Sequence, residues 1–166
     1  MIKSAYLLKS FIGPVCVAAI PKCGQHTLSA LSYASIEPKK IPEFSVRLAF
    51  VRDPLERLRS CFHFYLDSRF NIGGERIRSY QQFIDWALES QDEHVLPQAD
   101  FIAPLFNTVI SIRDMSSTLS RLTGRKVLTL NKSSRFDVDS SYRLIDVKNK
   151  YRKDYILCEK AQKWHM

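Results

Sequence analysis

The sequence has few glycines and lacks the glycine patterns of the commonest nucleotide-binding loops. Its five glycines never reach the Gly-x-Gly-x-x-Gly spacing of a dinucleotide-binding turn. No Gly-Lys pair occurs, so a Walker A loop is absent as well. Dehydrogenase and kinase functions of these kinds therefore lose most of their support.

Long apolar runs and paired cysteines are also missing. The first fourteen residues mix lysines with apolar residues, and no uninterrupted apolar stretch of 18 residues is present, so we expect no membrane anchor. Cys16, Cys23, Cys61 and Cys158 show neither disulfide nor metal-ligand spacing. We therefore expect reduced thiols, a cytoplasmic location and no bound metal.

The composition is that of a soluble globular protein with a basic balance. Of 166 residues, 45% are hydrophobic and 25% charged, and 25 basic against 17 acidic side chains give a net charge of +8. This charge suits an anionic ligand, but no motif of a nucleic-acid reader accompanies it, so we expect no nucleic-acid partner. Strand-like and helix-like segments alternate without repeats, which favours one α/β domain over residues 1–166 with a parallel sheet.

A first phosphate-binding segment follows the apolar run 15–20, which has no polar alternation and resembles a parallel strand covered on both faces. The next residues, 21–28, read Pro-Lys-Cys-Gly-Gln-His-Thr-Leu and precede a helix. Free N–H groups and the positive end of the helix dipole attract an anion there. Lys22 adds a full charge, Gly24 permits close backbone approach, and Thr27 offers a hydroxyl.

A second such segment begins at Arg52, after another short apolar run. Asp53 as N-cap, Pro54 at the first helical position and Glu56 at the third form a capping box. Ser60 lies about two turns further on the same face, and its side chain leans back toward Arg52. We expect both side chains to hold one phosphate.

Together the two segments resemble the sulfotransferases that use 3'-phosphoadenosine 5'-phosphosulfate, particularly the bacterial and carbohydrate branch. The family binds the 5'-phosphosulfate with Pro-Lys-x-Gly-x-[Thr/Ser]-[Thr/Ser]-Leu and the 3'-phosphate with Arg-Asp-Pro-x-x-Arg-x-x-Ser. The resemblance implies a P-loop-like three-layer α/β/α fold with a mostly parallel central sheet. It also implies sulfuryl transfer from that donor to a hydroxyl acceptor of the carbohydrate class, with 3',5'-adenosine bisphosphate as product. The donor-binding residues that it implies are Lys22, Cys23, Gly24, Gln25, His26, Thr27, Leu28, Arg52, Ser60, Lys132 and Arg135.

Two departures from the family pattern leave a second hypothesis open. Gln25 and His26 stand where the family has small or hydroxyl residues, and the stretch between the two motifs is short. The alternative is a nucleotide-binding or glycan-binding module that kept the fold and lost turnover.

Catalysis of this transfer needs a cation on the leaving oxygen and a base for the acceptor hydroxyl. We predict Lys22 for the first role. For the second we favour His94, because residues 94–98 resemble a His-x-x-Pro-Gln stretch of some carbohydrate sulfotransferases. The rivals are a carboxylate between the two motifs, Glu37 or Glu43, and the remaining histidines, His26, His63 and His165.

Four further expectations concern local structure. The position of Cys23 at a helix N-terminus beside a lysine predicts a thiolate that is sensitive to oxidation. Residues 67–78 look like a surface loop near the site, and Ser79 with Gln82 forms a capping box for the next helix. A last helix is expected to start at residue 140 or 141.

Overall fold

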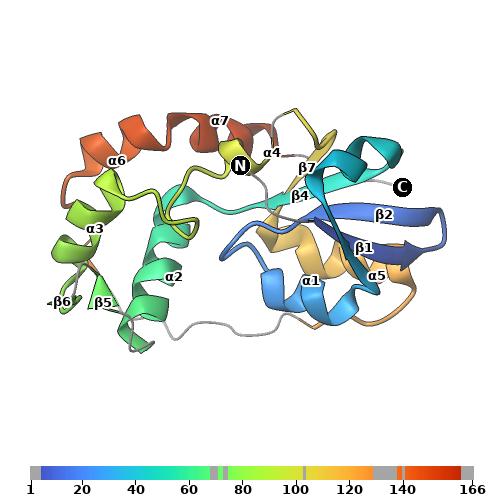
Figure 1. The fold of residues 1–166 in the computed structure, drawn as a ribbon, viewed down its shortest axis with the longest axis horizontal. Helices are drawn as coiled ribbons and strands as arrows, with labels where there is room; N and C mark the ends of the chain where they lie inside the picture. Colours follow the sequence, from blue (N-terminus) through green and yellow to red (C-terminus); the bar gives the residue numbers. More distant parts are fainter. Residues whose placement is uncertain are drawn as a thin grey trace.

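The protein is a mixed α/β structure in which a five-stranded sheet adjoins a group of helices (Figure 1). The structure, a computed structural model, describes residues 5–67, 71–72, 75–102, 104–128, 138–139 and 141–161. Its strands are β1 (Ala5–Ser10), β2 (Gly13–Ala18), β3 (Ala34–Ile36), β4 (Arg47–Val51), β5 (Asn71–Ile72), β6 (Glu75–Arg76) and β7 (Thr108–Ser111). Its helices are α1 (Gln25–Leu31), α2 (Pro54–Asp67), α3 (Tyr80–Glu89), α4 (Ala99–Ile102), α5 (Met115–Thr123), α6 (Leu144–Lys150) and α7 (Arg152–Lys160), with 3-10 turns η1 (Pro38–Glu43) and η2 (Ile112–Asp114).

The sheet has the order β3-β1-β2-β4-β7 and is mixed. Strand β4 runs parallel to β2 and to β7, whereas β1 lies antiparallel between β2 and β3. The prediction of a mostly parallel sheet was therefore wrong for the part formed by β3, β1 and β2. The antiparallel pairing of β1 with β2 comes from a hairpin that was not predicted from the sequence. Gly13 at φ 101° and a 2.7 Å hydrogen bond from Ser10 Oγ to the Gly13 carbonyl close this hairpin.

Helices cover both faces of the sheet, as the unbroken apolar runs predicted. In β2, Cys16 packs on the side that holds η1, α4 and the end of α7, while Val17 packs on the side that holds α1 and α5. In β4, Ala49 and Phe50 divide between the same two sides. Burial on both faces explains why neither strand shows the polar alternation of a half-exposed strand.

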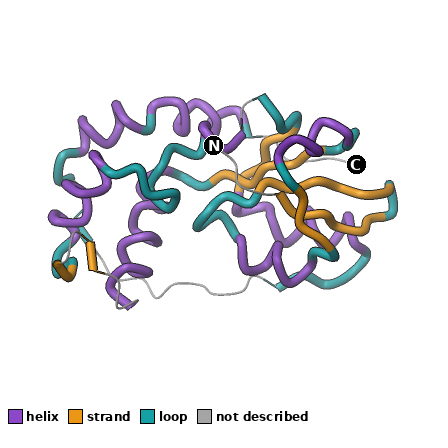
Figure 2. Tube along the Cα trace, viewed as in Figure 1, coloured by secondary structure: helices purple, strands orange, loops and turns teal. Residues whose placement is uncertain are grey.

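The remaining helices form a second apolar cluster beside the sheet (Figure 2). Helices α2, α3 and α6 lie together there, and Phe83 of α3 is fully buried against the ring of Phe62, with centroids 5.7 Å apart. The expected cap of α3 is confirmed by a 3.2 Å bond from the Gln82 N–H to Ser79 Oγ. This helical group positions one wall of the site.

Two local predictions need correction. Strands β5 and β6 pair within residues 67–78, which were expected to form only a loop. The expected last helix is two helices, α6 starting at Leu144 and α7 at Arg152, because Tyr151 leaves the helical path between them. The Tyr151 hydroxyl donates a buried hydrogen bond to the Val95 carbonyl, which fixes this break against the core.

Candidate functional site

The predicted phosphate loop connects β2 to α1, and its backbone is unusual. Lys22 has φ 64° and Gly24 has φ 81°, both in the left-handed region that is costly for residues other than glycine. A Cβ on Gly24 would run into the thioether of Met115. The positive φ of Gly24 is what favours glycine there, since the flexible tip of Met115 could move aside, and the backbone strain at Lys22 is of the kind that accumulates at ligand-binding sites.

The side chains of this loop divide into an exposed and a buried set. Gln25 and His26 are exposed at the start of α1, whereas Thr27 and Leu28 are buried. The sequence predicted donor contacts from all four. As the loop stands, Gln25 and His26 reach solvent, while Thr27 retains only 3% of its surface exposed.

Cys23 faces the core, and the predicted reactive thiolate is wrong. The thiol is 1% exposed and donates a 3.0 Å hydrogen bond to Gln98 Oε1. Burial raises the pKa of Cys23 to about 12, although the guanidinium groups of Arg57 and Arg52 act in the opposite direction. Desolvation therefore outweighs the helix terminus and the neighbouring cations.

We expect Cys23 to be inert toward iodoacetamide in the native protein at neutral pH. A pKa near 12 leaves roughly 10³-fold less thiolate than a free cysteine has, and burial blocks access as well. Peptide mapping by mass spectrometry after timed labelling measures this, with the protein in 6 M urea as the control. Labelling of Cys23 at the rate of an exposed thiol before unfolding would contradict its buried position.

The second predicted segment starts α2 as expected. The Glu56 N–H donates a 3.0 Å hydrogen bond to Asp53 Oδ1, which confirms the cap. The side chain of Arg52 is one quarter exposed, with its Nε 3.7 Å from Glu56 Oε2. Ser60 is 8% exposed within α2. The structure thus leaves Arg52 accessible to a ligand and places Ser60 deeper than its predicted role suggested.

Arg57, part of the same motif, turns inward. It is 1% exposed, and its guanidinium donates to three backbone carbonyls, those of Pro21 at 3.1 Å, Leu96 at 2.8 Å and Glu93 at 3.4 Å. Pro21 begins the phosphate loop, and the other two residues flank His94. Arg57 therefore ties the phosphate loop to the segment that carries the predicted base.

Gln98 makes a second link across the site and is fully buried. Its Oε1 accepts from the Cys23 thiol and, at 2.8 Å, from the Arg52 N–H, while its Nε2 donates to the Arg52 carbonyl at 2.7 Å. Asp154 of α7 accepts 2.8 Å and 2.9 Å bonds from the N–H groups of Gln98 and Ala99. The amide side chain of Gln98 thus connects the two predicted phosphate segments through hydrogen bonds to both.

The structure brings Lys22 and His94 to a single aromatic ring. Lys22 Nζ lies 4.5 Å from the centroid of the Phe64 ring, within the range of a cation–π interaction. The imidazole of His94 stacks on the same ring, with centroids 5.1 Å apart and planes inclined by 17°. The cation and the base predicted from distant parts of the sequence therefore both contact Phe64 of α2.

His94 is also held by Asp92. Asp92 Oδ1 lies 2.9 Å from His94 Nδ1 and accepts a 2.8 Å bond from the His94 N–H. Burial would raise the pKa of the Asp92 carboxyl, but hydrogen bonds from His94 and Tyr65 outweigh it and hold that pKa below its usual range. Asp92 is therefore ionised at neutral pH. The imidazole of His94 is 27% exposed, so it remains accessible.

The rival bases lie elsewhere. Glu37 pairs with Lys39 at 2.8 Å on the surface, and Glu43 is exposed at the end of η1. His63 is 9% exposed and contacts the Phe62 ring in α2. Lys132, Arg135 and His165 lie outside the described residues.

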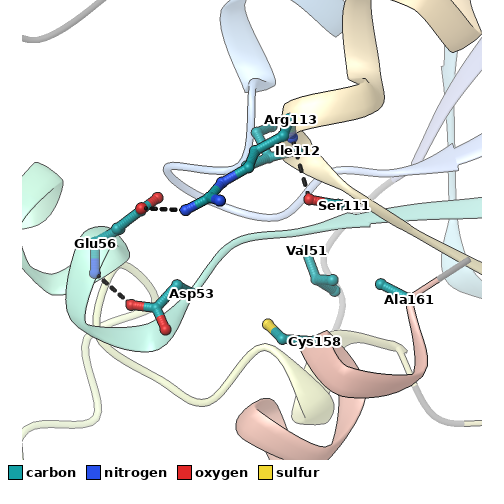
Figure 3. Close-up of a pocket in the computed structure, with 8 residues that line it drawn as sticks. All are labelled: Val51, Asp53, Glu56, Ser111, Ile112, Arg113, Cys158 and Ala161. Carbon is teal, nitrogen blue, oxygen red and sulfur yellow. Dashed lines mark hydrogen bonds and ion pairs between the residues drawn. The ribbon is translucent and has the colours of Figure 1, made fainter. Parts of the chain in front are cut away.

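A pocket of about 200 Å³ opens at the carboxyl ends of the parallel strands β4 and β7 (Figure 3). Glu56 and Arg113 reach toward each other on one side of it and form a 2.8 Å ion pair. Cys158 and Ala161, at the end of α7, line the other side. Ligands of open α/β sheets commonly bind at this edge.

The described residues contain neither a metal-binding cluster nor a membrane-spanning helix. No group of three or more histidine, cysteine or acidic side chains is placed to hold a metal ion in that part of the chain. None of the helices within the described ranges is long and apolar enough to cross a membrane.

Three residues of this site were not identified from the sequence as functional. Phe64 gave no signal, because an aromatic residue in an amphipathic helix usually belongs to the core. Asp92 did give a signal in the sequence, since an aspartate side chain often hydrogen-bonds to the backbone two residues further on and forms a local turn. Gln98 was noted only within the His-x-x-Pro-Gln stretch.

Comparisons of the chain with protein-family models, with curated proteins and with solved structures found no match. What the protein does is therefore inferred from its own residues.

Proposed function

We propose that the protein is a sulfotransferase that moves a sulfuryl group from 3'-phosphoadenosine 5'-phosphosulfate to a hydroxyl acceptor. The observation that carries this proposal is that Lys22 and His94 both contact the Phe64 ring. A cation and an accessible imidazole beside a phosphate-type loop are the groups that such a transfer needs.

The residues present fit a donor with two separated phosphates. The left-handed turn at Lys22 and Gly24 opens at the N-terminus of α1. Arg52 follows β4, the strand next to β2, and Gln98 holds the two segments together. Lys22 and the loop would hold the 5'-phosphosulfate, and Arg52 with Ser60 the 3'-phosphate.

In the proposed reaction, each bond change and proton transfer has a group that serves it. The bound donor supplies an electrophilic sulfur. An electron pair on the acceptor oxygen forms the new bond to sulfur, while the bond from sulfur to the 5'-phosphate oxygen breaks and leaves its electron pair on that oxygen. His94 takes the acceptor proton, and Lys22 stabilises the charge on the leaving oxygen.

A glycan hydroxyl is the acceptor that we propose, supported by the likeness of residues 94–98 to carbohydrate sulfotransferases. The test is incubation with sulfur-labelled donor and a panel of glycans, small alcohols and phenols, followed by chromatography of the products. Labelled glycan supports the proposal. Donor binding without product from any acceptor would favour the nucleotide-binding or glycan-binding module instead.

We expect 3',5'-adenosine bisphosphate to raise the melting temperature clearly more than adenosine 5'-monophosphate does. A ligand stabilises the folded state according to its affinity, and only the bisphosphate engages both phosphate segments. Arg52→Ala is expected to weaken bisphosphate binding by about 2 to 5 kcal/mol if the guanidinium is the ionic partner of the 3'-phosphate. Thermal-shift and calorimetric titrations measure both effects.

The matched control is Arg152→Ala, which removes an exposed arginine from the first turn of α7. Its bisphosphate affinity should equal that of the unmodified protein. Equal thermal shifts from the two nucleotides, or unchanged binding by Arg52→Ala, would remove the case for a 3'-phosphate site.

A further inference from the structure

Asp92 holds His94 through one oxygen atom. Its Oδ1 accepts the His94 N–H at 2.8 Å and lies 2.9 Å from the ring nitrogen Nδ1. An ionised carboxylate accepts hydrogen bonds and donates none, so Nδ1 has to carry the proton in this pair. The neutral ring is then protonated at Nδ1 and bare at Nε2.

We propose that Asp92 is the positioning residue of the base, which fixes the tautomer and orientation of His94 so that Nε2 receives the acceptor proton. This inference rests on the proposed function. Asp92 acts only through His94, and the acceptor proton is received at Nε2 of His94 rather than at Nδ1.

Neighbouring residues restrict the movement of Asp92 and His94. The Asp92 N–H donates to Ser90 Oγ at 3.0 Å, and Cys61 Sγ donates to the His94 carbonyl at 2.9 Å. The imidazole packs against two aromatic rings, stacked on Phe64 and edge-on to Tyr65 with centroids 6.0 Å apart. The backbone and the ring of His94 are therefore both fixed before an acceptor arrives.

The pair suits an acceptor whose hydroxyl is not ionised. As the oxygen bonds to sulfur, its proton passes to Nε2 and its electron pair enters the new bond, so His94 becomes an imidazolium facing the Asp92 carboxylate. An alcohol, such as a sugar hydroxyl, needs this proton removal. An acidic phenol that is already ionised does not.

Asp92→Asn is the test, because it keeps the size of the side chain and its turn with the backbone. With a glycan or alcohol acceptor we expect kcat to fall about 10²- to 10⁴-fold, while the affinity for 3',5'-adenosine bisphosphate stays unchanged. With 4-nitrophenol at pH 8 the fall should be less than about tenfold, since that acceptor is largely ionised. The control is Glu89→Gln, an exposed acid at the end of α3, which should leave both reactions unaffected.

A second readout does not depend on turnover. Nitrogen-15 NMR of the free protein should show a bare Nε2 and a protonated Nδ1 in His94, and a shift toward the other tautomer in Asp92→Asn. A protonated Nε2 in an active enzyme, or equal losses with both kinds of acceptor, overturns the role of Asp92 alone. A protein without turnover on any acceptor overturns the proposed function and the catalytic part of this inference together.

Discussion

Turnover by His94→Ala is expected to fall about 10²- to 10⁴-fold, the usual contribution of a general base, while affinity for 3',5'-adenosine bisphosphate changes little. The imidazole is accessible and would touch only the acceptor proton, so its loss acts on the chemical step. The Phe64 ring and the Asp92 turn would remain in place. Steady-state kinetics with a glycan acceptor, together with calorimetric titration of the bisphosphate, measures the two quantities separately.

Lys22→Ala provides the contrast within the same site. Lys22 would meet charge that is present in the bound donor and grows during transfer, so binding and rate should fall together. If His94→Ala retains near-normal turnover while Glu43→Gln or Glu37→Gln is inactive, the base lies in the segment between the motifs. The exposed positions of both glutamates lead us to expect normal activity from these two variants.

The largest effect on stability is expected from Arg57→Met. The change leaves the carbonyls of Pro21, Leu96 and Glu93 without their common donor. An unsatisfied buried acceptor costs about 1 to 3 kcal/mol, which applies in full to Pro21 and in part to the half-buried Leu96 and Glu93. Relaxation and water entry offset part of this, so we expect the free energy of unfolding to fall by about 3 to 5 kcal/mol. Urea unfolding followed by circular dichroism measures it.

Arg152→Met is the matched control, because Arg152 is exposed and lies in the first turn of α7, where a positive charge is unfavourable. It should change stability by less than about 0.5 kcal/mol. If Arg57→Met unfolds at the same urea concentration as this control, Arg57 does not hold the loop to the His94 segment. A folded Arg57→Met that loses bisphosphate binding alone would instead move Arg57 into the ligand site.

Features that depend on neighbours along the chain were predictable. Asp53 and Ser79 cap their helices as expected, because an N-cap bond joins residues within a single turn. The buried strands β2 and β4 were predictable because a short unbroken apolar run that ends at a turn is typical of a strand covered on both faces. The antiparallel pairing of β1 was missed, since the partner of a strand is decided by how the whole sheet assembles.

The direction in which each side chain of a motif points came only from the tertiary structure. Lys22 and Cys23 are adjacent, yet the first lies over an aromatic ring and the second is buried with a raised pKa. Arg57 belongs to the same motif as Arg52 but turns into the core. Whether a group is desolvated depends on what packs over it.

The pattern 21–28 and the motif at Arg52 thus predicted two phosphate-binding segments and a role for Lys22, and the resemblance of residues 94–98 to carbohydrate sulfotransferases added His94. Packing of α2 against the loop and against residues 92–98 brought those two side chains to Phe64 and bound both segments to Gln98. Such contacts join residues far apart in sequence, and their geometry is fixed by the close packing of the folded core rather than by local preference.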